Sequence, residues 1–431
     1  MIVYLAFVGL LILLIVLGMP VGFAAGVTAF SGAAYFFGDI GDPRAATMIA
    51  RLALDKMNNF LLLAIPFFLL AGRLMNTGGI TERLFDFVSL VVRPLRGGLG
   101  HANVLASVLF AGMSGSATAD AVGLGRIEMR AMLSQGYDRR FSAGITAASS
   151  LIGPILPPSI ALVAYSVQAE VSVAAMFFAA VTPGLLMAAA YMAYVSVQAR
   201  RAGMTAGRFA RLSELWPAFR KAILPILTPG IIMGGIYFGV FTPTEAAAVA
   251  ALYAALLGLL FYREFGLSVL LREIRGTLID SAVIMLIIAF TSAFGVLMIR
   301  GQVPIALAEY LASLTTSPTL LLLLLMGFWL VVGCFMAQTP AILILTPILM
   351  PIVERFGIDP IHFGVVMTLT LTLGLLTPPV GMVLYALIQV TELDFATLAR
   401  LAVPYLVLTV AVILLLIVVP ELVLFLPSVL R

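Results

Sequence analysis

The sequence predicts an all-α polytopic membrane protein made of two related halves, and three observations predict it. Hydrophobic residues make up 62% of the chain and charged residues only 10%, whereas about 25% of a soluble domain is charged. The mean hydropathy is +1.16, and apolar stretches of about 20 residues, enough to span a bilayer, follow one another almost end to end. The third observation is an internal repeat.

The repeat consists of glycines, prolines and polar residues that recur 221 residues later without a gap. The matched pairs are Gly112 and Gly333, Gly136 and Gly357, Asp138 and Asp359, Gly153 and Gly374, Pro157-Pro158 and Pro378-Pro379, and Gln168 and Gln389. Further upstream the shift is 223, as for Pro20 and Pro243. We therefore divide the chain into a first repeat, 1–221, and a second repeat, 222–431.

Composition excludes several classes of protein. The single cysteine, Cys334, excludes an internal disulfide. The two histidines, His101 and His362, lie far apart, and no cluster has the spacing of metal ligands. The net charge of +4 is modest, and we place the arginines in loops, where they indicate topology and not nucleic-acid binding. No charge precedes Asp39, so Met1–Leu17 is predicted to be a retained first span and not a signal peptide.

The first repeat begins with spans and continues into a hairpin. Met1–Gly38 holds two apolar stretches separated by Gly18-Met19-Pro20. Asp39–Asn59 has apolar residues at helical spacing, which predicts an interfacial helix, with a plain loop as the alternative. Spans are expected over Leu61–Met75 and from Leu84 until Arg93-Pro94 ends it. The segment of about 103–135 is too polar at its centre to cross the bilayer as one helix. We therefore expect a re-entrant hairpin with its tip at Gly112–Thr118.

A broken helix of about 141–169 follows the hairpin. Phe141–Leu151 and Ser159–Ala169 are its two arms, and Gly153–Ser159, with three prolines, is the break, because proline lacks the N–H that an α-helix needs. Val173–Ala199 is a long span. Arg200–Lys221 then carries six basic residues against one acid, which places this loop in the cytoplasm.

The second repeat has the same order. Ala222–Val240 and Glu245–Tyr262 are spans that return the chain to a basic loop, Arg263–Arg275. Leu278–Met298 is a span, Arg300–Ser317 a loop or surface helix, and Leu320–Val332 is very apolar. The second hairpin is placed at about 333–356, with Gln338-Thr339-Pro340 at its tip, and the second broken helix at about 363–389. Leu401–Leu430 is the final span.

Each break offers two kinds of binding group. The prolines are expected to leave the carbonyls of Ser150, Gly153 and Pro154 without partners, which a bilayer tolerates only at a cavity or inside protein. Such oxygens suit a dehydrated Na⁺. The half-helices that begin at Pro157-Pro158-Ser159 and Pro378-Pro379-Val380 direct their N-termini into the site, where they attract anions. Paired broken helices indicate the site of a secondary transporter; the alternative is a kink that serves only packing.

Four acidic residues have distinct interpretations. Asp120, just past the first tip, is a functional candidate because it is an intramembrane acid; the alternatives are pairing with Arg126 or Arg130, or a hairpin cap. Asp138 and Asp359 are expected to cap the helices that follow them. Glu245 is expected to stabilise the first turn of its helix.

Four motifs carry a resemblance to a known family. They are Gly112-Met113-Ser114-Gly115-Ser116-Ala117-Thr118-Ala119-Asp120, Ser149–Ser159, Thr242-Pro243-Thr244-Glu245-Ala246 and Gly374-Leu375-Leu376-Thr377-Pro378-Pro379-Val380-Gly381. With them, nearly the whole chain resembles the large membrane subunit of tripartite ATP-independent periplasmic (TRAP) transporters, which are not enzymes. The resemblance implies two inverted repeats, an elevator-type transport domain that moves against a scaffold, and a multi-pass protein of the bacterial inner membrane.

The resemblance also implies ligands and partners. It implies Na⁺-coupled uptake of an organic acid such as a C4-dicarboxylate or sialic acid, a periplasmic binding protein that delivers it, and a small four-span membrane subunit, which we expect to be a separate chain. No cofactor is expected, and no metal beyond Na⁺. The Na⁺ ligands expected in the two halves are Ser114, Ser116, Ser150, Gly153 and Pro157, and Thr339, Gly374, Thr377 and Pro379. Substrate contacts are expected from Gly115, Thr118, Asp120, Pro158, Ser159, Gln338 and Pro378.

Three alternatives remain. A stand-alone Na⁺/carboxylate symporter would share the architecture but need no binding protein. An intramembrane serine protease would use Ser114 of the Gly112-Met113-Ser114-Gly115 pattern with His362 as base, which requires hydrogen-bond contact between them. A passive channel would not accumulate substrate against a gradient.

Overall fold

The computed structural model describes residues 2–38 and 42–429 and confirms the predicted all-α polytopic class. The described residues contain no strand, only an isolated bridge between Arg96 and Ala206. Seven helical segments in this part of the chain are long and apolar enough to cross a bilayer. They are η1–α4 (Phe60–Leu63 and Ala64–Thr77), α11 (Val173–Arg201), α12 (Leu212–Tyr237), α13–η3 (Pro243–Leu256 and Leu257–Phe261), α14 (Leu267–Arg300), α16 (Pro318–Phe335) and α20 (Phe395–Val418).

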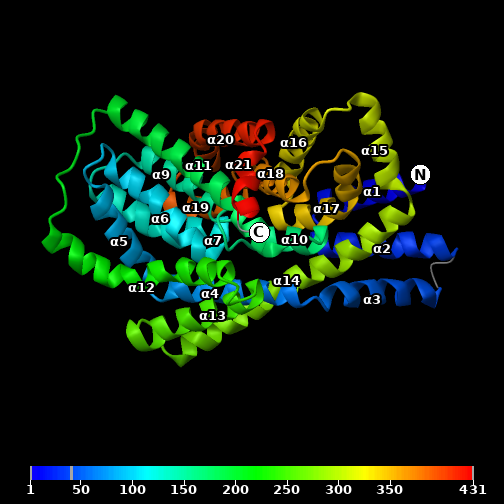
Figure 1. Ribbon diagram of the computed structural model, residues 1–431, viewed down its shortest axis with the longest axis horizontal. Helices are drawn as coiled ribbons and strands as arrows, with labels where there is room; N and C mark the ends of the chain where they lie inside the picture. Colours follow the sequence, from blue (N-terminus) through cyan, green and yellow to red (C-terminus); the bar gives the residue numbers. More distant parts are fainter. Residues whose placement is uncertain (1, 39–41, 430–431) are drawn as a thin grey trace.

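The N-terminal helices α1 (Ile2–Val16) and α2 (Val21–Phe37) separate at Gly18–Pro20 as predicted. α3 (Pro43–Met57) confirms a helix within Asp39–Asn59, so the plain loop is wrong; residues 39–41 of that range lie outside the described residues. Asp42 caps α3 by accepting the Arg44 backbone N–H at 2.8 Å. α3 lies along α2 and the long α14, at the right of Figure 1.

α5 (Ile80–Val92) precedes the first hairpin. The hairpin and the first break occupy the next six elements, which are α6 (Gly98–Ser114), α7 (Ala117–Val122), α8 (Leu124–Ser134), α9 (Arg139–Ser149), η2 (Ser150–Ile152) and α10 (Ile160–Ala169). The first arm therefore begins at Gly98, earlier than the predicted 103, and the second arm divides at Gly123. Asp138 caps α9 as predicted, because its carboxylate accepts the Phe141 N–H at 2.9 Å.

The second hairpin and break follow the same order. α15 (Val303–Leu314) precedes them, and they comprise α16, α17 (Gln338–Arg355), α18 (Pro360–Leu373), η4 (Gly374–Leu376) and α19 (Met382–Thr391). Asp359 caps α18 as predicted, accepting the Ile361 N–H at 2.7 Å. Both Pro-Pro bonds, Pro157-Pro158 and Pro378-Pro379, are cis.

The helix that leads into the second tip is longer than the sequence suggested. α16 starts at Pro318 and continues through Phe335, so the turn lies at Met336 and Ala337. Leu320–Val332, predicted as a separate apolar stretch, is the first arm, and Gln338 is the first residue of α17 and not the turn. The apolar residues around Cys334 suit a helix, and no breaker marks the sequence at Gly333.

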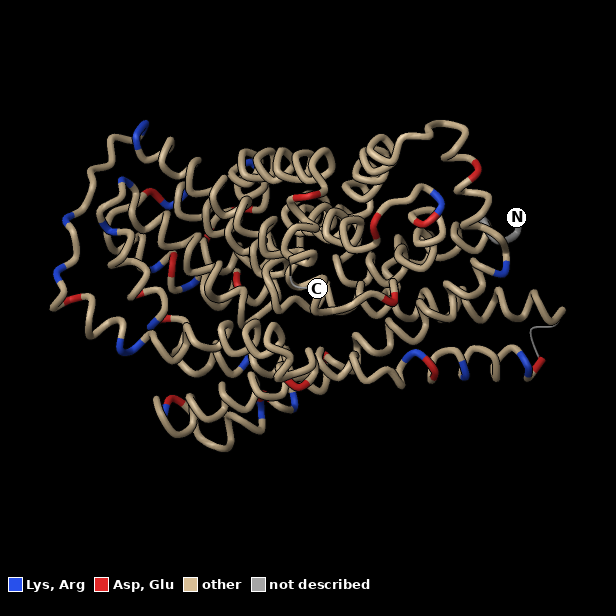
Figure 2. Tube along the Cα trace, viewed as in Figure 1, with Lys and Arg blue, Asp and Glu red and all other residues tan. Residues whose placement is uncertain are grey.

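Two further predicted helix starts, both based on the positions of basic residues, are wrong. α12 begins at Leu212, so only residues 202–211 of the predicted Arg200–Lys221 loop are non-helical, and the division at 221 falls inside a helix. α14 begins at Leu267, within the predicted Arg263–Arg275 loop. Lysine and arginine are good helix formers, so basic residues do not mark helix ends. Figure 2 shows many of the basic residues over α5, α9, α12 and the segment before α12.

The predicted final span is two helices. α20 ends at Val418, and α21 (Glu421–Val429) follows after Val419 and Pro420. Proline disfavours helical backbone angles at the residue before it, and Val419 accordingly has φ −124° and ψ 78°.

The two halves interlock at the centre of the molecule. α10, which follows the first break, packs on α17 and α18 of the second half. α19, which follows the second break, packs on α7, α8 and α9 of the first half. Each half-helix therefore lies against the hairpin of the other half, and this exchange brings both breaks into one region.

Candidate functional site

The first hairpin tip lies directly against the first break. Gly115 ends α6 with φ 60°, and a Cβ atom there would lie 2.6 Å from the Pro158 carbonyl oxygen. Only glycine fits both the left-handed conformation and this close approach. Ser116 then caps α7 by accepting the Ala119 N–H at 3.5 Å, and its hydroxyl lies 3.2 Å from that of Thr118.

Asp120 faces the break from the first turn of α7. Its carboxyl group is buried, at 2% exposure, and Oδ1 accepts the hydroxyl hydrogen of Ser114. Oδ2 has no hydrogen-bond partner among the described residues. The Oδ2 atom is so close to Gly153 that a Cβ atom on that residue would overlap it. Asp120 makes no ion pair with Arg126 or Arg130 within the described part of the chain, so that alternative is wrong.

The break itself satisfies more of its backbone than predicted. The Ser150 carbonyl accepts the Gly153 N–H at 3.4 Å, and the Pro154 carbonyl accepts the Ser159 hydroxyl at 2.5 Å. The prediction that both carbonyls lack partners is wrong, because a short 3-10 turn and a serine side chain replace the missing amide donors. Ser159 also caps α10, accepting the Leu162 N–H at 3.3 Å, and is wholly buried. Ser150 donates its hydroxyl to the Ala147 carbonyl at 2.8 Å.

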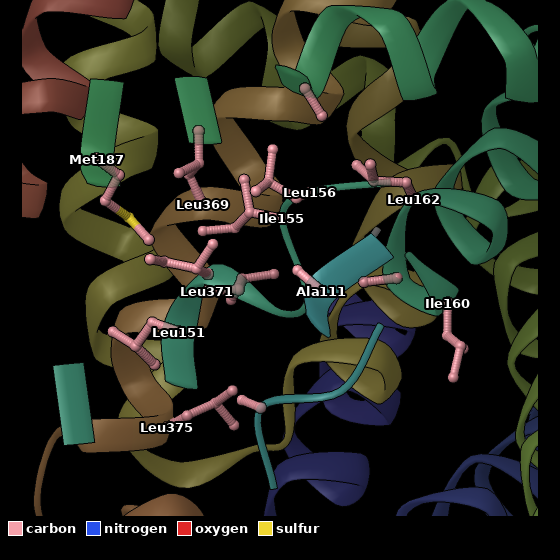
Figure 3. Packing of buried hydrophobic residues seen from close by; sticks show 14 of the residues in the cluster. Ala111, Leu151, Ile155, Leu156, Ile160, Leu162, Met187, Leu369, Leu371 and Leu375 are labelled. Atoms are coloured by element: carbon pink, nitrogen blue, oxygen red, sulfur yellow. The ribbon is translucent and has the colours of Figure 1, made fainter. Parts of the chain in front are cut away.

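One side of the first break is filled by apolar side chains. Figure 3 shows Leu151, Ile155 and Leu156 beside Leu369 and Leu371 of α18. Pro157 and Pro158 are buried too. Apolar side chains and buried prolines therefore surround much of this break.

The second hairpin also meets its own break through main-chain atoms. The Val380 N–H donates to the Cys334 carbonyl at 3.2 Å, and Gly333 lies against Gly374 so closely that a Cβ on Gly374 would overlap the Gly333 backbone. Thr377 donates its hydroxyl to the Leu373 carbonyl at 2.8 Å, which leaves the lone pairs of its oxygen free. Pro378 and Pro379 are exposed, unlike the two prolines of the first break.

Gln338 is held by the second broken helix. Its side chain is buried, and its Nε2 donates to the Thr368 carbonyl at 3.1 Å and to the Thr372 hydroxyl at 2.6 Å. Neither of these two hydrogen bonds uses the side-chain oxygen of Gln338. Gln338 therefore ties the first turn of α17 to α18.

A cavity of about 520 Å³ lies where the two tips converge. Both tips, both breaks, both following half-helices, α4 and α14 contribute to its wall. The lining residues are Leu69, Gly115, Ser116, Ala117, Thr118, Pro154, Ile160, Ala161, Asp280, Val283, Ile284, Ala337, Gln338, Thr339, Pro340, Leu375 and Met382. Of the predicted substrate contacts, Gly115, Thr118 and Gln338 line it; Asp120, Pro158, Ser159 and Pro378 do not.

A smaller cavity of about 290 Å³ shares part of this wall and reaches the first ion-binding candidates. Ser116 and Thr118 border both cavities, and Ser114 borders the smaller one. The smaller cavity also contains Arg73 and Asn76, which sequence reasoning missed.

Arg73 of α4 and Asp280 of α14 form an ion pair at this wall. The two side chains are 2.5 Å apart, and Arg73 also lies 3.4 Å from Glu273. Arg73 interrupts the apolar run Leu61–Met75, and Asp280 opens the run Leu278–Met298. A charged residue inside such a run is a candidate for function, and that signal was available in the sequence.

The oxygen ligands at the tips and breaks suit a monovalent cation. No group of three or more His, Cys, Asp or Glu side chains that could hold a metal ion occurs among the described residues. Serine and threonine hydroxyls, backbone carbonyls and the free oxygen of Asp120 are the groups that discontinuous helices offer to Na⁺.

The protease hypothesis fails on geometry. The Ser114 hydroxyl donates to Asp120, and the His362 ring nitrogen Nε2 lies 2.9 Å from the Leu416 carbonyl. Ser114 and His362 therefore have separate partners, and no nucleophile–base pair forms.

Comparison with known proteins agrees with this geometry. Residues 8–422 match the family described as tripartite ATP-independent periplasmic transporter, DctM component. The chain is 41% identical to the sialic acid TRAP transporter large permease protein SiaM of Vibrio cholerae, over 95% of each chain. It is 39% identical to the C4-dicarboxylate TRAP transporter large permease protein DctM of Pseudomonas aeruginosa, over 90% of each chain.

Solved structures show the same fold at low sequence identity. The YdaH transporter of Alcanivorax borkumensis superimposes with a TM-score of 0.65 at 16% identity, covering 88% of this chain and 89% of that one. Taken with the long family match, the two large permeases and the broken-helix architecture, this identifies the chain as a member of the DctM family of TRAP transporter large permeases, a transporter component and not an enzyme.

Proposed function

We propose that the protein carries out Na⁺-coupled uptake of an organic acid across the bacterial inner membrane by an elevator mechanism. A periplasmic binding protein delivers the acid, and a small four-span membrane subunit completes the transporter. The observation that carries the proposal is the cavity into which both hairpin tips, both breaks and both following half-helices converge.

The ions and the substrate have separate places in this proposal. One Na⁺ lies between the first tip and the first break, near Ser114, Asp120 and Gly153, where an unpartnered carboxylate oxygen supports it. A second Na⁺ lies near Thr377 and Gly374, where the Thr377 oxygen keeps its lone pairs. The substrate occupies the cavity between them, in contact with Ser116, Thr118 and Thr339.

The arrangement of the elements supports inverted repeats and a moving hairpin domain. Hairpin, broken helix and half-helix recur in the same order, and each half-helix packs on the hairpin of the other half. Inverted repeats that meet at a central site are typical of secondary transporters, and one unit then moves against the other. The hairpins and broken helices form the moving unit of this proposal, and α4 and α14 belong to the scaffold.

The substrate class follows from the relatives and from the site. The names of two relatives specify sialic acid and C4-dicarboxylates, which are both carboxylates. Helix N-termini favour carboxylates by their N–H groups and dipole. We therefore propose a carboxylate substrate, with sialic acid as the first to be tested.

Reconstitution tests this function. The chain is placed in proteoliposomes with its small membrane subunit, and uptake of labelled sialic acid and of a C4-dicarboxylate is measured with and without the binding protein encoded beside it. Inward Na⁺ gradients are compared with K⁺ gradients. We expect accumulation above the external concentration only with Na⁺ and the binding protein.

The other outcomes separate the alternatives. Accumulation without the binding protein indicates a stand-alone symporter, and equilibration without accumulation indicates a channel. Ser114→Ala and Thr377→Ala are expected to raise the Na⁺ concentration that gives half-maximal uptake. Unchanged Na⁺ titrations in both variants would contradict the assignment of the ion sites.

A further inference from the structure

A cluster of polar side chains is buried behind the first hairpin, away from the cavity. Asn103 of α6, Glu128 of α8 and Thr146 of α9 are 0%, 1% and 1% exposed. The Asn103 Nδ2 donates to the Glu128 Oε2 at 2.7 Å and to the Thr146 Oγ1 at 2.8 Å. The cluster therefore joins three helices of the hairpin region.

Two oxygens of this cluster lack donors. Glu128 Oε1 and Asn103 Oδ1 have no hydrogen-bond partner among the described residues, and both are inaccessible to solvent. A buried carboxylate requires a compensating positive charge or loses its own charge. Burial of a lone glutamate between three packed helices thus calls for a ligand.

No basic side chain supplies the missing charge. Among the described ion pairs none includes Glu128. The titratable residues on α8 and the elements that pack against it are Glu82, Arg83 and Asp86 of α5, His101 of α6, Asp120 of α7, Arg126 and Arg130 of α8, Arg139 and Arg140 of α9, and Tyr385 of α19. Several are engaged elsewhere: Arg83 with Glu264, Arg139 with Glu392, and His101 with Ser196.

We propose that Glu128, Asn103 and Thr146 form a proton-binding site in the first hairpin region, and that uptake requires this site to be occupied. The proton binds Glu128, whose O–H then donates to the Asn103 side-chain oxygen. Because an amide has an oxygen and an NH₂ group on either side of one carbon, a half turn of the Asn103 amide exchanges donor for acceptor. Asn103 can therefore keep one hydrogen bond to Glu128 in either form of the acid.

A proton fits this place better than a metal cation. Neither cavity that borders the first hairpin is lined by Asn103, Glu128 or Thr146. A dehydrated Na⁺ requires several oxygen ligands and room among them, whereas a proton requires one acceptor. Loss of the proton leaves an uncompensated buried charge among α6, α8 and α9, which disfavours the packed hairpin. Occupancy of Glu128 thus couples to the hairpin that bears the tip.

The test compares the pH dependence of uptake in the native protein and in Glu128→Gln. The test rests on the proposed function, because uptake is what it measures. It is made in proteoliposomes with saturating Na⁺, the small subunit and the binding protein. Glutamine mimics the protonated acid. Native uptake is expected to decline at alkaline pH, approaching tenfold per pH unit as one proton is lost, whereas Glu128→Gln keeps its acidic-pH rate there. Glu309→Gln, which alters an exposed acid on α15, should behave as the native protein.

Each remaining outcome decides the proposal. A native pH profile in Glu128→Gln overturns it, and so does loss of uptake at every pH in a folded variant, because the carboxylate would then be required. If the variant fails to fold, infrared spectra of the native protein decide: a protonated-carboxyl band must be present near neutral pH and disappear in alkali, and its absence overturns the site. Na⁺ dependence is measured in parallel at acidic pH, so a failure of Na⁺ coupling is seen separately.

Discussion

At the scale of single residues, the position of Asp120 decides what the first half can bind. Sequence reasoning left it between a functional role, as a substrate contact, and a structural role, as a partner for arginine or a hairpin cap. The structure places one carboxylate oxygen on the Ser114 hydroxyl and leaves the other unpartnered beside Gly153. A buried carboxylate with one free oxygen, next to a broken helix, is suited to hold a cation.

Asp120→Asn tests this directly. The variant keeps the shape of the side chain but removes its charge. Hydrogen bonds to a charged group contribute about 1.5–3 kcal/mol to stability or binding. We therefore expect the Na⁺ concentration for half-maximal uptake to rise by about tenfold or more. Asp394→Asn is the control, because the Asp394 carboxylate caps α20 at the surface, where the Thr397 side chain and backbone lower its pKa. An equal effect in both variants would count against a specific ion site.

A pair of glycine substitutions tests the same contact sterically. A Cβ on Gly153 would overlap Asp120 Oδ2, whereas a Cβ on Gly144 of α9 would have its nearest neighbour at an ordinary 3.5 Å. Gly153→Ala is expected to abolish the Na⁺ response of uptake by displacing the carboxylate, and Gly144→Ala to leave it unchanged. Na⁺ titration of uptake, with folding checked by size-exclusion chromatography, measures both. Native Na⁺ dependence in Gly153→Ala would show that the carboxylate is not a ligand.

At the scale of elements, the second hairpin and second break are joined by backbone contact. Gly333 and Gly374 approach so closely that neither tolerates a larger residue without movement, and Val380 donates to Cys334 across the same contact. The tip of the hairpin is thus held close to the break, where we propose the second ion site.

Gly374→Ala should separate these two elements. Overpacking of a close contact costs about 1–3 kcal/mol, so a lower melting temperature and a loss of uptake are expected. Gly327→Ala is the control, since Gly327 lies in α16, the helix that also carries Gly333, with nothing within 4 Å of its added Cβ. Equal melting temperatures for the two variants would mean that the contact is not tight in the membrane.

The sequence predicted the presence of helices and breaks better than it predicted the residues at which the helices begin and end. Gly and Pro pairs located both breaks, and Asp138 and Asp359 located the helix starts after both hairpins, because these residues act locally on the backbone. Basic residues misplaced the starts of α12 and α14, since Arg220 and Lys221 mark a membrane boundary but continue a helix. The pairing of Arg73 with Asp280 depends on a tertiary contact between α4 and α14 that no local pattern carries.

At the scale of the whole molecule, the exchange of half-helices explains why both breaks meet in one cavity. α10 packs on the second hairpin and α19 on the first, so neither hairpin moves without carrying part of the other half. This packing favours movement of the two hairpins as one unit against α4 and α14. Inverted repeats also require that equivalent loops of the two halves face opposite sides of the membrane.

Accessibility of single cysteines tests that requirement. Ser134 ends α8, Arg355 ends α17, and the shift of 221 relates them; both are exposed. In a Cys334→Ala background, Ser134→Cys and Arg355→Cys are expected to react with a membrane-impermeant maleimide from opposite sides in oriented vesicles. Ala206→Cys, in the exposed basic segment before α12, provides the cytoplasmic reference, because the positive-inside rule places that segment there. Labelling of positions 134 and 355 from the same side would rule out inverted repeats and, with them, the proposed elevator movement.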